Sequence, residues 1–138
     1  MNPERGGSSG GPAPAADLHV HTTASDGVLT VPELASVARA GGVDVVAVTD
    51  HDRVHPDLDA PVTTRDGVTV IRGLELRVET DEQRQDLLGY GVEAAASIRS
   101  VTERIQADRK RRGAEIVRRV EERLGVDLDV ALREGLGR

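Results

Sequence analysis

The feature that most constrains this chain is a strand–helix–strand pattern between residues 16 and 53. Short apolar runs at residues 16–20 and 43–49 are each followed at once by histidines and aspartates, and an amphipathic segment joins them. Two strands connected by one helix lie parallel in the same sheet, so the polar residues that follow them meet at one edge. The pattern therefore predicts an α/β fold with a polar site at the carboxyl ends of its strands.

The helix expected between these strands starts after Thr30 and runs to about Ala40. Thr30 and Glu33 form a capping-box pattern, Pro32 is tolerated in the first turn, and the glycine pair at 41–42 ends the helix. The side chains expected to be buried are Leu34, Val37 and Ala38.

Candidate metal ligands follow each of the two strands. His19 and His21 are two residues apart, so both side chains point to the same face of a strand. Asp26 follows in a Ser-Asp-Gly turn, and His51 lies in the Thr-Asp-His-Asp that ends the second strand. Imidazole and carboxylate groups are ligands for first-row metals, so the pattern indicates a metal centre. The competing interpretations are strand histidines satisfied by the backbone and a carboxylate that only forms a turn.

The middle of the chain predicts a loop followed by strands. Residues 52–66 contain prolines and a Thr-Thr-Arg-Asp-Gly turn, so we expect a loop or at most one turn of helix there. A third strand is expected at 68–71. Further strands at 74–78 and 87–90 are compatible with a hairpin around the polar segment 80–85.

The carboxyl-terminal part is expected to be helical. A helical pattern covers residues 94–124, with a lapse at 108–112 and Gly125 as its end. A short helix is expected at 128–133. The apolar positions expected on one face of the long helix are Ile98, Val101, Ile105, Ile116, Val120 and Leu124.

The composition of the 138 residues narrows the class of protein. Because Tyr90 is the only aromatic residue, the stacking platforms that bind single-stranded nucleic acid are not expected. The net charge of −6 and the single lysine, Lys110, argue against nonspecific binding of polyanions such as duplex DNA. There is no cysteine, which excludes disulfides and thiolate metal sites.

One domain is expected from residue 16 to residue 138, in the cytoplasm and without a membrane partner. No run approaches the ~20 apolar residues of a membrane span. Residues 1–15 are too poor in apolar side chains to offset the entropy cost of ordering them, so a disordered tail is expected. This tail also lacks the apolar central region of a secretory signal.

Together these motifs resemble the first part of the PHP family, the polymerase and histidinol phosphatase domain of metal-dependent phosphoesterases. The resemblance covers nearly the whole expected domain. The most similar branch contains phosphatases of 3′,5′-bisphosphonucleotides and 5′-to-3′ exoribonucleases of short RNA. The residues that carry the resemblance are His19-Val-His21, Asp26 in Ser-Asp-Gly, Thr49-Asp-His-Asp52 and Glu75 in Gly-Leu-Glu.

The resemblance implies a distorted β/α barrel with up to three divalent metal ions, manganese, iron or zinc, at its mouth. His19, His21 and Glu75 would surround one metal, with Glu75 bridging to a second. Asp26 and His51 would serve a third. A metal-bound hydroxide would then attack phosphate esters of small nucleotides or of short RNA 5′ ends.

Asp50 and Asp52 are the candidate catalytic carboxylates, and they are expected behind the ligands, where they would orient the histidines. For Asp52 the alternative is a turn-forming or helix-capping role, and for Glu75 it is an exposed strand position. His55, which precedes Pro56, is expected to be a loop histidine and not a ligand.

Three further candidates lie in the second half of the chain. Where family members carry a histidine, this chain has Asp86 in Asp-Leu-Leu-Gly-Tyr, and an aspartate can bind the same metals. Arg109 and Arg112 belong to a basic cluster that would aim guanidinium groups at substrate phosphates from a helical cap. A solvated charged face is the alternative for this cluster.

The chain ends at 135–138, in a segment that resembles the point where family members continue into the second half of the barrel. The expectation is therefore the first half of a barrel, truncated and with an open sheet edge through which chains could self-associate. Three functions fit this expectation. They are a phosphoesterase or its amino-terminal piece, a truncated and inactive remnant, and a half-barrel binding module that pairs with itself or with a separate second half.

Overall fold

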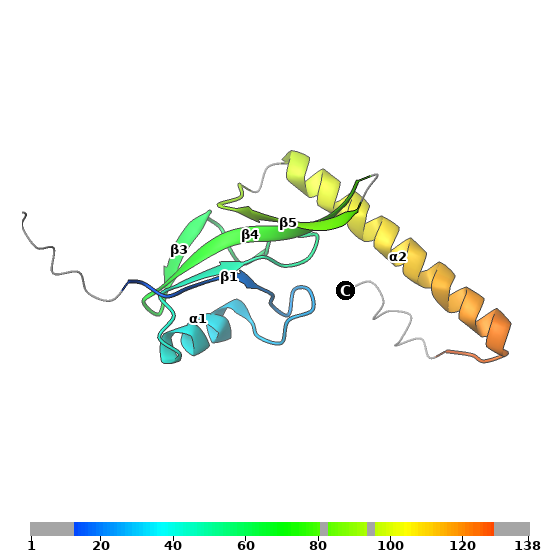
Figure 1. Cartoon of the computed structure of the whole chain (residues 1–138), viewed down its shortest axis with the longest axis horizontal. Helices are drawn as coiled ribbons and strands as arrows, with labels where there is room; N and C mark the ends of the chain where they lie inside the picture. The colour runs from blue at the N-terminus through cyan, green and yellow to red at the C-terminus, as the bar shows by residue number, and fades with distance from the viewer. Residues whose placement is uncertain (1–12, 81–82, 94–95, 129–138) are drawn as a thin grey trace, which may run out of the picture.

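The computed structural model describes residues 13–80, 83–93 and 96–128, which form a mixed five-stranded sheet and two helices (Figure 1). The shorter helix packs on one face of the sheet, and the longer one runs past the end of the sheet. The elements in chain order are β1 (Ala16–Val20), α1 (Val31–Ala40), β2 (Val45–Val48), β3 (Val62–Arg65), β4 (Val68–Glu79), β5 (Arg84–Tyr90) and α2 (Ala96–Leu124).

The expected amino-terminal tail and the short helix expected at 128–133 lie largely outside the described residues. Ala15 is described, and its backbone is paired. Its N–H donates to the Asp44 carboxylate at 2.9 Å, and its carbonyl oxygen accepts from the N–H groups of Asp44 and Val45. The paired part of the chain therefore begins one residue before Ala16.

Three of the strands are parallel, which confirms the strand–helix–strand unit. β1 pairs with β2 and β2 pairs with β4, so the order of the sheet is β1-β2-β4-β3. On its other edge, β4 has two antiparallel partners, β3 along its first part and β5 along its second. Among the described strands, the outer edges of β1, β3 and β5 have no partner. The sheet is therefore an open, partial barrel, as the sequence predicts.

The helix α1 begins with the expected capping box, in which the Thr30 N–H donates to Glu33 Oε2 at 2.8 Å. Val37 was expected to be buried, but it is 55% exposed. At about 100° per residue it lies off the apolar face of the helix. The buried side chains of α1 are Val31, Leu34, Ala35 and Ala38.

The core between α1 and the sheet is aliphatic. Each valine or leucine buried there contributes about 1.5–3 kcal/mol of transfer free energy. This cluster holds the strands whose ends carry the polar site. Its buried members are Val31, Leu34, Ala38, Val46, Val48, Leu58, Val68 and Val70.

The prediction of a loop over residues 52–66 is wrong for its last part, because β3 occupies Val62–Arg65 and pairs with β4. The Thr-Thr-Arg segment is strand, and only Asp66 and Gly67 form the turn. Both have positive φ, 50° and 79°, which suits a two-residue hairpin. Pro61 and the polar threonines hid this strand, because its stability comes from pairing with β4 and not from its own apolar pattern.

The strands expected at 68–71 and 74–78 are one continuous strand, and the hairpin with β5 is confirmed. Gly73 keeps β4 unbroken at a tight point, because a Cβ there would lie 2.5 Å from the Gly89 carbonyl oxygen. The partner strand also starts earlier than expected, at Arg84. One long strand therefore connects the core to the polar site.

The helix α2 is a single helix that continues through 108–112 and ends before Gly125, whose φ is 64°. The expected buried face is largely absent. Figure 1 shows why: much of α2 extends beyond the sheet. Within the described ranges, neither helix has the combination of length and hydropathy that a membrane span requires. The expected face positions that are exposed are Val101, Ile116 and Leu124, whereas the buried positions of α2 are Thr102 and Val117.

Candidate metal centre

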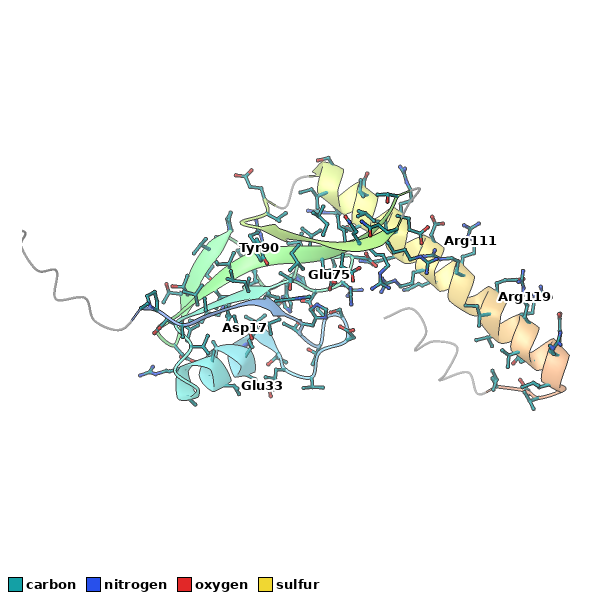
Figure 2. The ribbon with its side chains drawn as sticks, viewed as in Figure 1. Asp17, Glu33, Glu75, Tyr90, Arg111 and Arg119 are labelled. Carbon is teal, nitrogen blue, oxygen red and sulfur yellow. The ribbon has the colours of Figure 1, made fainter. Side chains whose placement is uncertain are left out.

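The predicted ligands meet where β1 and β2 end beside the middle of β4. His21 follows β1, and His51 follows β2. The backbone of His51 forms an isolated parallel bridge with Glu75, so the chain after β2 continues alongside β4. Figure 2 shows Glu75 within the sheet, in the half that lies nearer to α2. The order β1-β2-β4 thus places residues from three neighbouring strands at one point.

Three imidazole nitrogens surround one carboxylate oxygen. Glu75 Oε2 lies 2.8 Å from His21 Nε2, 3.1 Å from His51 Nδ1 and 3.3 Å from His19 Nε2. The Nε2 atoms of His19 and His21 are themselves 3.2 Å apart. Glu75 is only 3% exposed. The alternative of an exposed strand carboxylate is therefore wrong for Glu75.

Hydrogen bonding alone does not account for this cluster. His51 Nδ1 is buried and has no hydrogen-bond partner, although Glu75 Oε2 is 3.1 Å away. Ligands at 2.0–2.2 Å from one shared cation lie about 3 Å from one another. The donor set, imidazole nitrogens and a buried carboxylate, is the one that divalent first-row metals prefer. The residues present therefore fit a divalent metal ion.

Asp26 joins the same cluster from the loop after β1. His21 Nδ1 donates to Asp26 Oδ1 at 2.7 Å, and His51 Nε2 lies 3.6 Å from Asp26 Oδ2. Because a carboxylate oxygen only accepts, this hydrogen bond places a proton on His21 Nδ1, so that Nε2, which lies 2.8 Å from Glu75 Oε2, is the nitrogen that could bind a cation. Two groups of possible ligands result. They are His19, His21 and Glu75, and His21, Asp26 and His51.

The electrostatics of Asp26 follow from these contacts. Partial burial acts to raise the pKa of the Asp26 carboxyl, but the hydrogen bond from His21 and the charges of His51 and His21 outweigh it. The pKa is therefore lowered, so the carboxylate is ionised and able to bind a cation at neutral pH. Gly27 closes this turn tightly, because a Cβ there would lie 2.2 Å from the His21 carbonyl oxygen.

Asp50 contacts a loop and not a histidine. Its fully buried carboxylate accepts hydrogen bonds from the Thr22 N–H and Oγ1, both at 2.8 Å, and from Ser25 Oγ at 2.6 Å. The expectation that it orients a histidine is not what the contacts show. Asp50 instead holds the loop that carries Asp26.

Asp52 links the strand ends to α2. Its N–H donates to the Glu75 carbonyl oxygen at 2.8 Å, and its own carbonyl oxygen accepts from Gln106 Nε2 at 2.7 Å. Its buried carboxylate lies 2.5 Å from Arg109 Nη2. Asp52 adopts a positive φ of 51°, an uncommon conformation for a residue other than glycine. Like that of Asp50, its carboxylate forms no hydrogen bond or ion pair with a histidine among the described residues.

Asp86 lies outside both groups of possible metal ligands. It faces Arg77 across the β4–β5 hairpin and forms a two-pronged ion pair with it, at 2.8 and 3.2 Å. This hydrogen bonding to Arg77 lowers the pKa of Asp86. His55 also joins neither group, and its Nδ1 accepts from the Asp57 N–H at 3.1 Å.

A pocket of about 550 Å³ lies beside the cluster, between the β4–β5 hairpin and α2. Asp26, His51 and Asp52 contribute to its lining. The predicted Arg109 and Arg112 both border it. The remaining arginines of the lining are Arg77, Arg84 and Arg111. The lining also contains Glu79 and Asp108, which pair with Arg84 and Arg111.

Sequence reasoning missed Arg77, Arg84 and Gln106. A signal existed for the two hairpin arginines. Positions 75, 77 and 79 of β4 share one face, and Arg84 pairs with Glu79 across the hairpin. No local signal existed for Gln106, because its contact with Asp52 spans 54 residues.

Comparisons with known proteins agree with this geometry. The family model for the PHP domain matches residues 17–130, and the chain belongs to this family. A 5′-3′ exoribonuclease of Haemophilus influenzae is 32% identical over 102 residues, which are 72% of this chain and 37% of that protein. A 3′,5′-nucleoside bisphosphate phosphatase of Chromobacterium violaceum is 31% identical over 93 residues, 63% of this chain and 33% of that protein. The chain thus spans about a third of the length of these curated relatives.

Solved structures show the same fold. An amidohydrolase from Chromobacterium violaceum, with bound sulfate and no metal, superposes with a TM-score of 0.67 at 24% identity, over 82% of this chain and 40% of that chain. A protein described as a metal-dependent phosphoesterase, from Bifidobacterium adolescentis, gives a TM-score of 0.66 at 27% identity, over 80% of this chain and 40% of that chain. The partial barrel therefore corresponds to part of a larger PHP barrel.

Proposed function

We propose that this chain forms the metal-binding part of a hydrolase that cleaves phosphate esters of small nucleotides or of short RNA 5′ ends. The observation that carries the proposal is the convergence of three imidazoles on Glu75 Oε2. A pocket lined by five arginines lies directly beside this cluster. Metal ligands next to an anion pocket are the two parts that metal-assisted phosphate hydrolysis requires.

The roles of the residues follow from their contacts. His19, His21 and Glu75 would hold one divalent ion, manganese, iron or zinc, and Glu75 is central enough to bridge to a second. His51 and Asp26 would hold a further ion. Such ions would lower the pKa of bound water and neutralise part of the negative charge of the phosphate.

Three neighbouring carboxylates keep the histidine ligands in place. Asp26 fixes the proton position of His21, and Asp50 fixes the loop that carries Asp26. Asp52 joins the site to α2 through Gln106 and Arg109. Asp50 and Asp52 are therefore proposed as positioning residues and not as proton-transfer groups.

The arginines would bind the substrate. A guanidinium group matches the oxygens of a phosphate with two parallel hydrogen bonds. Arg109 is well placed for this role, because its ion pair with Asp52 holds it at the border of both the cluster and the pocket. Arg112 borders the same pocket from the next turn of α2. The nucleotide or RNA substrate is proposed from the names of the relatives, a 5′-3′ exoribonuclease and a nucleoside bisphosphate phosphatase.

A half-barrel binding module is the second candidate, and a specific observation favours it. The outer edges of β1, β3 and β5 are unpaired among the described strands, and an unpaired edge is a template for another chain. Self-association through these edges would give a module that holds metal without hydrolysing phosphate esters by itself. The third possibility, an inactive remnant, would bind no metal.

One experiment separates these possibilities. The 138-residue chain is stripped of metal, titrated with Mn²⁺ by calorimetry, and assayed for phosphate release from a 3′,5′-bisphosphonucleotide. Hydrolysis with bound Mn²⁺ supports the phosphoesterase. Bound Mn²⁺ without hydrolysis, in a dimer by sedimentation, supports the half-barrel module. No bound metal supports the remnant. His55→Ala is the control, because His55 joins neither ligand group.

A further inference from the structure

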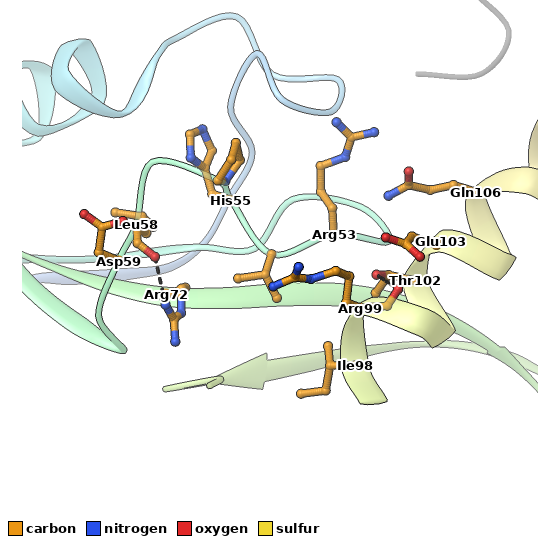
Figure 3. A pocket seen from close by; sticks show the side chains of 12 residues that line it. Arg53, His55, Leu58, Asp59, Arg72, Ile98, Arg99, Thr102, Glu103 and Gln106 are labelled. Carbon is orange, nitrogen blue, oxygen red and sulfur yellow. Dashed lines mark hydrogen bonds between the residues drawn. The ribbon is translucent and has the colours of Figure 1, made fainter. Parts of the chain in front are cut away.

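A second pocket, of about 560 Å³, lies between the loop at 53–59 and the amino-terminal half of α2 (Figure 3). It is distinct from the pocket beside the metal cluster, because no residue lines both. Of its lining residues, only Gln106 takes part in the proposed function, through its contact with Asp52. It has the size of pockets that bind small molecules, which occupy about 300–1,000 Å³.

The wall formed by β4 contains a buried positive charge. Arg72 is only 4% exposed, and its Nε and Nη1 donate to the carbonyl oxygens of Val92 at 2.6 Å and Leu58 at 2.8 Å. No ion pair joins Arg72 to a carboxylate among the described residues. A buried guanidinium without a counter-charge is costly, and an anion in the pocket would offset that cost.

Two more arginines border the same space. Figure 3 shows the side chain of Arg99 extending from α2 across the pocket, and Arg53 at the end of the pocket nearest Gln106. The Nε atom of Arg53 is buried and has no hydrogen-bond partner. Asp59 and Glu103 also line the pocket, but neither forms an ion pair with these arginines among the described contacts. Positive charge therefore exceeds negative charge in the pocket.

The rest of the lining is partly apolar, with Val54, Leu58 and Ile98 on its walls. An apolar wall with a few cationic groups suits a ligand that carries one phosphate on an organic body. We propose that this pocket binds a small phosphorylated molecule of nucleotide size, with its phosphate on Arg72 and Arg99 and its organic part against Val54, Leu58 and Ile98.

The pocket is connected to the metal centre by a short path. Gln106 lines this pocket and donates to the Asp52 carbonyl oxygen, and Asp52 pairs with Arg109, which lines the other pocket. A ligand between the loop at 53–59 and α2 would therefore contact the same helix that carries the phosphate-binding arginines. The binding site itself does not depend on the proposed hydrolysis.

The test measures binding of AMP by calorimetry to the full 138-residue chain without metal. The chain carries Arg109→Gln and Arg112→Gln, which weaken anion binding in the other pocket. We expect AMP to bind at one molecule per chain, and adding Arg99→Gln to weaken this binding by about tenfold, the effect of one lost charge-assisted hydrogen bond. The matched control is Arg104→Gln, an exposed arginine of the same helix that lines neither pocket, and it should leave the affinity unchanged.

Two further ligands identify the chemistry that is recognised. Inorganic phosphate should bind the same site more weakly than AMP and with the same sensitivity to Arg99→Gln. Adenosine, which lacks the phosphate, should be insensitive to that variant. Circular dichroism verifies that each variant is folded.

Two results would overturn the proposal. One is no AMP binding by the Arg109→Gln/Arg112→Gln chain, and the other is AMP affinity that Arg99→Gln leaves unchanged. Failure of the proposed function gives a different result, because it appears as absence of Mn²⁺ binding by the wild-type chain while the AMP titration is unaffected.

Discussion

The strand-end cluster and the helix α2 contribute to the same pocket but are held in very different ways. The cluster is fixed by backbone pairing of β1, β2 and β4 and by buried hydrogen bonds from Thr22 and Ser25 to Asp50. By contrast, α2 extends past the sheet, and its polar contacts with the strand ends converge on Asp52 (Figure 1). In the proposed function, metal binding would therefore belong to the rigid part, whereas substrate binding would depend on a helix attached at few points.

The largest effect is expected at the centre of the rigid part. Glu75→Gln removes the charge around which three imidazole nitrogens gather, so Mn²⁺ affinity should fall by at least about a hundredfold. Titration calorimetry measures this change. Glu79→Gln, an exposed position on the same strand, is the control. Equal Mn²⁺ affinity for Glu75→Gln and wild type would show that Glu75 is not a ligand.

The next effect concerns stability and not metal. Asp50→Ala leaves the buried N–H and hydroxyl of Thr22 and the hydroxyl of Ser25 without their acceptor, which should cost about 2 kcal/mol in the free energy of unfolding. Urea denaturation of the metal-free chain measures it. Asp59→Ala, at an exposed loop position, should change stability little. Unchanged stability of Asp50→Ala would contradict the loop-holding role.

A smaller effect is expected at the attachment of α2. Arg109→Gln removes the ion pair with Asp52 and one guanidinium from the pocket, so the affinity of the Mn²⁺-loaded chain for inorganic phosphate should fall by about tenfold. Mn²⁺ affinity itself should remain unchanged, because Arg109 is not part of the cluster. Arg104→Gln is the control on the same helix. An equal loss of Mn²⁺ affinity would show that metal binding by the cluster depends on α2.

The smallest effect lies on the exposed part of α2. Hydrogen bonds from Arg118 and Arg119 hold the pKa of the Glu115 carboxyl at about 2, below its usual 4.5. A lowered pKa contributes stability that is complete above pH 4.5 and is lost as the pH falls toward 2. The helical signal in circular dichroism should therefore decrease slightly more with acid in the wild type than in Glu115→Gln. Identical acid titrations of the two proteins would show that this ion-pair network does not stabilise α2.

The sequence predicted the elements whose signals are local. The capping box at Thr30 and the alternation of His19 and His21 each lie within a few residues, and both are present in the structure. β3 could not be predicted in this way, because its threonines and Arg65 have no apolar pattern and depend on β4. For α2 the sequence predicted a buried face that is largely exposed. A periodic apolar pattern indicates a helix but does not show whether another element packs on it.

The same distinction applies to the candidate site. Strand-end logic predicted that His21 and His51 would meet, because it needs only the order of parallel strands. Glu75 was expected beside them from the resemblance to the PHP family. The partners of Asp50 and Asp52 could not be inferred. Asp50 bonds to Thr22, 28 residues away, and Asp52 bonds to Gln106, 54 residues away. Such contacts depend on how loops and helices pack against each other. The residues next to Asp50 and Asp52 in the sequence do not indicate that packing.

The unbroken course of β4 limits how the gene can change length. Val68 to Ile71 pair with β3, and the stretch after Gly73 pairs with β5, so both hairpins share one alternation of side chains. Deleting a single codon between them would bring Leu76 to the position of Glu75 and turn a leucine toward the histidines. Deleting two codons would keep the alternation but bring Arg77 to the position of Glu75. The strand should therefore tolerate no change of length before Glu75, whereas the turn at Asp66 and Gly67 can vary more freely.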